Sequence, residues 1–322
     1  MIKKLLVLTV VSLSVLIPCT SQNINAASEW DNAVTVYGAA LESDTGLQEQ
    51  TADLLGASDS DIIDYVYSED VSQYVNQNYD NSVLMSSIRI QQTSEVSGLN
   101  INIDESLGNI TMISEETYQN ALLTSGITDA DVTIAAAQDV TGESALAGVY
   151  KAYAAQGEEI DPEKTQNAQD ELDAISDITN ENSNVEGFTQ VQLNKVITEV
   201  KVEIINNFNG DVSEEQIRSI LDEKLAENGL EGLLSQEQID RLVEIFNSIK
   251  DSGIFTGEEA KRLVDSSEDL LNRITSSDSF QDAKDSASEL GRDIADSEEV
   301  NSFMEALRNF WDRIVEFFRG LF

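Results

Sequence analysis

The chain has 322 residues, with 60 acidic and 19 basic residues and a formal net charge of −41. It has no histidine, and its one cysteine, Cys19, lies close to the N-terminus. A chain of this composition lacks the groups for Ser-His-Asp or Cys-His catalysis and for a zinc site with His or Cys ligands. The charge also argues against nucleic acid as a partner, because phosphate binding needs clustered Lys and Arg.

The first 26 residues have the pattern of a secretory signal peptide. Basic Lys3–Lys4 precede the apolar run Leu5–Ile17, Pro18 ends that run, and Ala26 offers a small residue for cleavage. A retained N-terminal anchor is the alternative, but the run is shorter than a membrane span needs. A lipid anchor on Cys19 is disfavoured because Pro18 stands where a small residue is required. We therefore expect export and no transmembrane segment after signal removal.

The next part of the chain mixes strand and helix patterns. Short alternating runs predict strands, and apolar residues at helical spacing predict helices between them. The expected strands are 33–37, 87–90, 99–103, 110–113 and 131–135. The expected helices carry Leu47 to Leu55, then Tyr118 to Leu123 after a Ser114 cap, and finally a small-residue face from Ala145 to Ala155. We predict an α+β N-terminal domain at residues 33–157.

An all-α helical region follows, which we expect as a helical domain at residues 158–274. Asp161 and Pro162 form a typical helix start, and apolar spacing predicts a longer helix through 191–208. Three similar segments then begin at Ser213, Ser235 and Thr256, each followed three residues later by Gln or Glu. This spacing predicts three short helices with capping boxes. Calcium-binding hands are disfavoured because no loop has the required ligand spacing.

Residues 275–300 are rich in Ser, Asp and Glu, which predicts an acidic linker or a solvated helix. Residues 301–322 then have the spacing of one amphipathic helix. The favoured interpretation is that this helix packs on the helical region and closes its core. Docking on a partner or a membrane surface is the alternative. The docking candidates are the large apolar residues Phe303, Leu307, Phe310, Trp311, Ile314 and Phe318.

The most site-like stretch runs from the end of one expected helix to the start of the next. Its ligand-binding candidates are Thr124, Gly126, Asp129, Asp131, Thr141 and Gly142. Asp129 and Asp131 could ligate a hard cation such as calcium, or they could cap the start of a strand, and the cap is favoured. Nucleotide binding is not expected, since Gly142 stands alone and no phosphate-binding glycine motif surrounds it.

The same stretch resembles the YpuA-like secreted proteins, which carry domain of unknown function 1002. The resemblance is most specific in two segments and extends to short matches upstream, which are 118–132, 140–152, 38–41, 86–87 and 98–99. The family usually has a proline after the alanine strand, and Ala137–Asp139 has none. The resemblance implies export from Gram-positive bacteria and an unassigned activity, and it supplies no catalytic residues.

Two functional hypotheses follow from these observations. The first is a secreted, non-enzymatic protein, extracellular or associated with the cell wall, that binds an envelope component or a protein partner. The second is a hydrolase of envelope glycans that uses two carboxylates, with or without calcium, because carboxylates are the abundant acid-base groups of the chain. No other cofactor is expected.

Overall fold

The computed structural model describes residues 30–93 and 98–283. The expected signal peptide, most of the expected acidic linker and the C-terminal amphipathic helix lie outside the described residues. The described chain contains these elements in order: β1 (Val34–Gly38), η1 (Ala39–Ser43), α1 (Thr45–Leu55), β2 (Ile62–Val66), α2 (Ser68–Val75), η2 (Asn81–Val83), β3 (Ser87–Gln92), β4 (Leu99–Asp104), α3 (Glu115–Thr124), β5 (Ala130–Ala135), α4 (Ser144–Ala155), α5 (Pro162–Glu181), α6 (Gln190–Phe208), α7 (Glu214–Glu227), α8 (Gln236–Asp251) and α9 (Gly257–Ser276).

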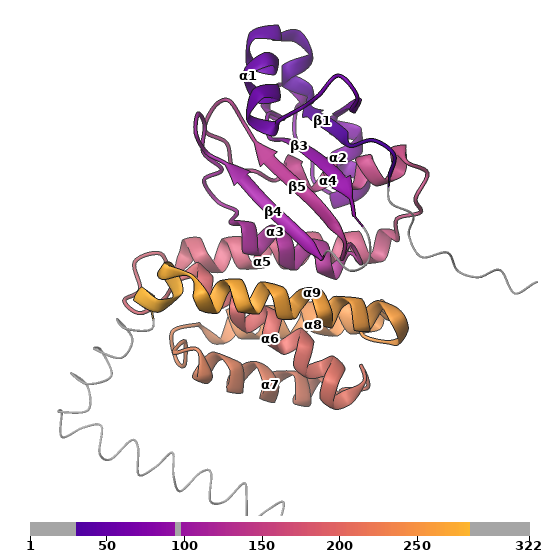
Figure 1. Ribbon diagram of the computed structural model, residues 1–322. Helices are drawn as coiled ribbons and strands as arrows, with labels where there is room; N and C mark the ends of the chain where they lie inside the picture. Colours follow the sequence, from indigo (N-terminus) through magenta and orange to yellow (C-terminus); the bar gives the residue numbers. More distant parts are fainter. Residues whose placement is uncertain (1–29, 94–97, 284–322) are drawn as a thin grey trace, which may run out of the picture.

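A five-stranded mixed sheet, in the order β2-β1-β3-β5-β4, forms the N-terminal part of the fold (Figure 1). β3 runs antiparallel to its neighbours β1 and β5, while β2 and β4 pair parallel at the two edges. The parallel pairs need crossover connections, and α1 and α3 lie on these connections. The sheet followed by a run of helices confirms the predicted α+β class with an all-α region after it.

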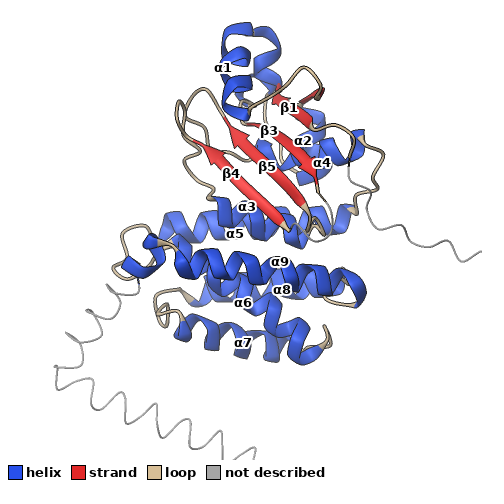
Figure 2. Ribbon diagram, viewed as in Figure 1, coloured by secondary structure: helices blue, strands red, loops and turns tan. Residues whose placement is uncertain are grey.

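The two faces of the sheet have different coverings. Val36, Ile88 and Ile134 are buried on the face where α4 packs against β1 and β3, and α3 covers β4 on that side. At Gly148, α4 packs so close to the sheet that an added Cβ would lie 3.3 Å from the Ile88 side chain. On the opposite face α1 covers one end of the sheet, and the rest of β4 and β5 faces the viewer uncovered (Figure 2). The period-two alternation of these strands therefore reflects a dry face and a partly wet one.

The predicted strand at residues 110–113 is wrong. Ile110 makes one isolated bridge with Val140, and the chain then turns so that Ser114 caps α3. Two elements that the sequence did not predict, β2 and α2, lie between α1 and β3. β2 is an edge strand whose Ile62 and Ile63 are 40% and 48% exposed, so its apolar residues show no buried alternation.

The remaining helices form layers beside α3 and α5 (Figure 1). Asp161 caps α5 and Pro162 is its first residue, as predicted. Ser213 and Ser235 form complete capping boxes with Gln216 and Gln238, which also confirms the prediction. The helices are longer than the short helices expected, since α9 alone has 20 residues.

The third capping box is wrong. The Thr256 side chain makes no cap hydrogen bond and instead donates to the Gly253 carbonyl at 2.9 Å. Glu259, which was expected to reach back to the helix start, accepts two hydrogen bonds from Lys164 at 2.7 and 2.8 Å. An ion pair with α5 therefore replaces the local cap.

α3 joins the sheet part to the helical part. Residues Thr117–Thr124 are all buried, because the sheet lies on one side and α5, α6 and α9 lie on the others. The main cluster of buried side chains runs without a break from Trp30 to Phe280. Within the part of the chain that the structure describes, no helix has the length and apolar character needed to cross a membrane.

Candidate functional site

The six ligand candidates lie in three separate places. Thr124 is the last residue of α3 and is buried, and Gly126 follows it with a φ of +89°, where glycine is favoured. Asp129 and Asp131 lie at the start of β5. Thr141 and Gly142 come after the end of β5, just before α4. The structure therefore does not bring the six residues together into one site.

Thr124 belongs to a buried polar network between α3, α5 and α6. Its hydroxyl donates to Glu171 at 2.8 Å, and Lys201 forms an ion pair with the same carboxylate at 2.7 Å. Lys201 also donates to the Asn120 carbonyl at 2.9 Å. Burial raises the pKa of Glu171 and lowers the pKa of Lys201, while the charge of each partner opposes the shift of the other. Because both side chains are at most 1% exposed, this network is sealed and holds the helices together.

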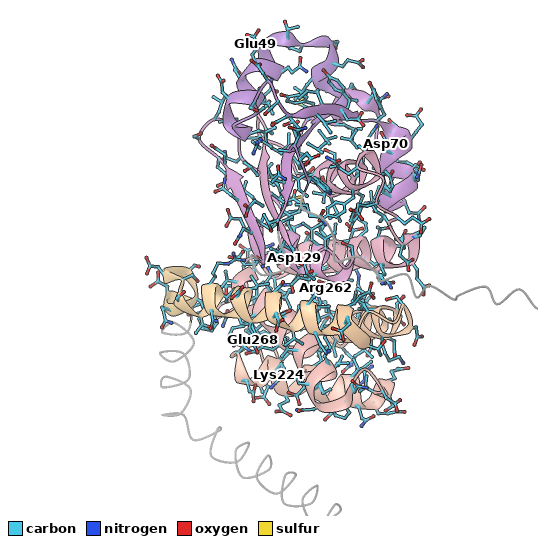
Figure 3. All side chains as sticks on the ribbon, turned by 45° about the vertical axis from the view of Figure 1, so that its right-hand side comes forward. Glu49, Asp70, Asp129, Lys224, Arg262 and Glu268 are labelled. Atoms are coloured by element: carbon cyan, nitrogen blue, oxygen red, sulfur yellow. The ribbon has the colours of Figure 1, made fainter. Side chains whose placement is uncertain are left out.

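Asp129 and Asp131 each accept a hydrogen bond from a neutral side chain. Asp129 accepts from the Thr128 hydroxyl at 2.6 Å, and Asp131 accepts from the Asn100 amide at 2.9 Å. Figure 3 shows Asp129 at the boundary between the sheet and α9. No group of three or more metal-ligating side chains occurs among residues 30–93 and 98–283.

Thr141 and Gly142 line a cavity of about 250 Å³ beside the start of α4. Gly142 has a φ of +111°, and its carbonyl accepts from the Tyr118 hydroxyl at 2.6 Å. A Cβ at this position would lie 2.5 Å from that hydroxyl oxygen, so glycine is required by conformation and by space. Tyr79 and Glu143 line this cavity and also line a neighbouring one beside α5.

A second cavity of about 250 Å³ shares Tyr79 and Glu143 with the first and is lined by residues of α5. We call it the acidic groove. Its walls come from the segment before β3, the segment before α3, the start of α4, α5 and α8, and its lining includes Tyr79, Met112, Glu143, Asp173, Ser176, Asp177 and Arg241. Asp173 and Arg241 also line a further cavity of about 320 Å³, so the acidic groove shares lining residues with two neighbouring cavities.

Asp173 is a half-buried carboxylate in the wall of the acidic groove. Its carboxylate accepts from Gln77 at 3.0 Å and from Gln169 at 2.6 Å. Burial raises the pKa of Asp173, the charges of Asp177 and Asp170 raise it further, and the two amide hydrogen bonds offset this in part. The pKa of Tyr79 is raised by burial, with smaller contributions from the charges of Glu143 and Asp173.

The acidic groove was not predicted from the sequence, apart from its neighbours Thr141 and Gly142. The sequence does contain one relevant pattern. A spacing of three and four residues places Asp170, Asp173 and Asp177 on one face of the expected helix. That face carries like charges, which an isolated helix disfavours. Tyr79, Glu143 and Arg241 come from distant segments, and no local pattern relates them to α5.

The fold and the acidic groove define an α+β protein with a helical layer and an open, negatively charged groove between them. Comparison with protein families gives the class a label. The family model described as "Protein of unknown function (DUF1002)" matches residues 37–266, and the chain belongs to this family. The chain is also 28% identical over 257 residues to a Bacillus subtilis (strain 168) protein, "Uncharacterized protein YpuA", covering 78% of this chain and 83% of that protein. No solved structure matches the chain.

Proposed function

We propose that this protein is a secreted, non-enzymatic protein of the cell envelope or extracellular space, and that it acts by binding a ligand in the acidic groove. The observation that carries the proposal is the half-buried Asp173, which lines the acidic groove and accepts hydrogen bonds from the neutral amides of Gln77 and Gln169. The two amide hydrogen bonds reduce the cost of partly desolvating this carboxylate but do not neutralise its charge, so a cationic ligand group in the groove would be favoured.

Export is supported by the basic and apolar start of the chain, which has the form of a secretory signal. Membership in the DUF1002 family is compatible with a wall of the Gram-positive type, because a relative belongs to Bacillus subtilis. Envelope components and proteins of the cell surface are therefore the proposed partners.

Photocrosslinking on intact Gram-positive cells tests this function. A photoreactive phenylalanine analogue replaces Met112, which lines the acidic groove, and a matched chain carries it at Ile63, which is exposed on β2. We expect a defined crosslinked product from position 112, and we expect that excess unmodified protein prevents its formation. Equal labelling from both positions, or no product from position 112, would contradict binding in the acidic groove.

Carboxylate-based hydrolysis of envelope glycans is a second candidate. The observation that favours it is that Asp173, whose pKa is raised, and Glu143 line one groove, as an acid and a second carboxylate would in a glycoside hydrolase. Incubation with wall polymer, with and without calcium, should then release fragments, and Asp173→Asn and Glu143→Gln should each abolish the release. If the wild-type protein releases no fragments under either condition, hydrolysis is excluded for that polymer.

A further inference from the structure

The acidic groove has more negative than positive charge on its walls. Glu143, Asp173 and Asp177 contribute carboxylates, and Arg241 is the cation among its lining residues. Arg241 forms an ion pair with Asp177 at 2.8 Å, where the two side chains are 40% and 54% exposed. This pair lies at the exposed side of the groove and leaves the more deeply buried Asp173 without a counter-charge.

A second, independent feature of the acidic groove is an unused hydroxyl. Ser176 is 8% exposed and is one of the residues that line the groove, and its buried Oγ has no hydrogen-bond partner among the described residues. Ser176 lies one helical step of three residues after Asp173, so both side chains point from the same face of α5. A buried hydroxyl without a partner costs stability, and a ligand atom that bonds to it would remove that cost.

The number of carboxylates distinguishes between two kinds of cation. Calcium takes six to eight oxygen ligands, and a protein site usually supplies several carboxylates that converge on one point. No such convergent group of three occurs in the described part of the chain. An organic cation needs one carboxylate, further hydrogen-bond acceptors and apolar walls, and Met112 and Ile113 supply apolar wall beside Asp173.

We infer that the acidic groove binds the primary ammonium group of an aliphatic amine, such as a lysine side chain or a free diamine. This inference rests on the proposed binding function and names the ligand class. The ammonium group has three donors, and the Asp173 carboxylate and the Ser176 hydroxyl each have an acceptor site left. Tyr79 and Met112 also line the groove, where the alkyl chain of the amine would pack.

Titration calorimetry at physiological ionic strength tests the ligand class. The probes are diaminopentane and an acetylated lysine amide, which separate a free diamine from a peptide-borne side chain, with pentanol as the uncharged control. We expect one saturable site for at least one amine and no heat with pentanol. Nonspecific attraction to a protein of charge −41 would give weak binding without a defined stoichiometry, and that result would overturn the inference.

Variants of α5 connect the binding to the acidic groove. Asp173→Asn should weaken amine binding at least about tenfold, since a charge-assisted hydrogen bond is lost. Ser176→Ala should weaken it about threefold, as expected for a neutral hydrogen bond. Glu163→Gln is the matched control, because it removes the same charge from an exposed position in the first turn of the same helix, and it should bind like the wild type.

Three results would overturn the inference. They are equal affinity of the wild type and Asp173→Asn, a calcium affinity that exceeds the amine affinity and depends on Asp173, and no amine binding by wild-type protein that is folded by circular dichroism. If the wild type binds no amine but position 112 still gives a crosslink that Asp173→Asn abolishes, the groove is retained as a binding site and only the amine is rejected. If the wild type gives neither amine binding nor this crosslink, the site is rejected as well.

Discussion

At the residue scale, the buried pair of Glu171 and Lys201 should make a substitution of one partner alone strongly destabilising. Lys201→Met leaves a buried carboxylate whose remaining side-chain partner is the Thr124 hydroxyl. Breaking a buried ion pair from one side costs about 3–5 kcal/mol, so we expect the free energy of unfolding to fall by that amount. Urea denaturation measures it. The double variant Glu171→Met, Lys201→Met should recover most of the loss, and a double variant as unstable as the single one would show that the pair itself stabilises the fold.

Asp61 makes the stability depend on pH. Its side chain is 1% exposed and accepts from Arg89 at 2.8 Å, from Thr35 at 2.9 Å and from the Ser58 backbone at 3.1 Å. Burial acts to raise the pKa of Asp61, but these hydrogen bonds and the charge of Arg89 outweigh it, so the pKa is lowered. A lowered pKa means stability that is present above the unfolded-state value of about 4 and is lost as pH falls through the folded-state value.

We therefore expect Asp61→Asn to be less stable than the wild type by about 1.5–3 kcal/mol at neutral pH, as for a hydrogen bond to a charged group. The difference should shrink on acidification, because the wild-type carboxyl becomes protonated. Urea unfolding at several pH values checks this. A difference between the two proteins that stays constant from neutral pH to well below the ordinary Asp pKa would contradict the assignment.

Single residues show where sequence reasoning reaches its limit. The end of α3 near Gly126 was predicted, since a cap at Ser114 and a glycine after the helix are local signals. The partner of Thr124 was not, because Glu171 is 47 residues away and nothing in a helical stripe marks one carboxylate as buried. Asp173 was missed for the same reason.

At the element scale, the caps of α8 and α9 provide a matched pair. Ser235 and Thr256 are both exposed and both precede similar segments, but only Ser235 accepts a cap hydrogen bond, from Gln238 at 3.2 Å. We expect Ser235→Ala to lower the free energy of unfolding by about 1 kcal/mol, as is typical of a lost cap. Thr256→Ala should change it by less than about 0.5 kcal/mol, as at other surface positions. Equal losses in chemical denaturation would show that Thr256 caps α9 in solution.

The same helices explain which elements could be predicted. Caps that depend on residues three apart were right twice, and the third failed because Lys164, 95 residues away, takes Glu259. The order of the strands could not be derived, since β4 pairs with β5 across the whole of α3. The acidic groove is lined by residues of α5, α8 and the segments before β3 and α3, so it forms only when these distant parts of the chain pack together.

At the scale of the whole molecule, a chain ending at Val300 tests the role of the C-terminal segment. The main buried cluster runs from Trp30 to Phe280, so the residues up to 283 already supply a continuous core. We expect this shortened chain to keep the thermal midpoint of the mature protein and to lose part of its association with cell envelopes in a sedimentation assay, since the acidic groove remains. Phe310→Ser with Trp311→Ser in the full chain should give the same loss, because both docking candidates become polar. A midpoint that falls by several degrees on shortening would instead show that residues 301–322 close the core, since a loss of about 1 kcal/mol shifts the midpoint by about 2–4 °C even in domains of about 150–250 residues.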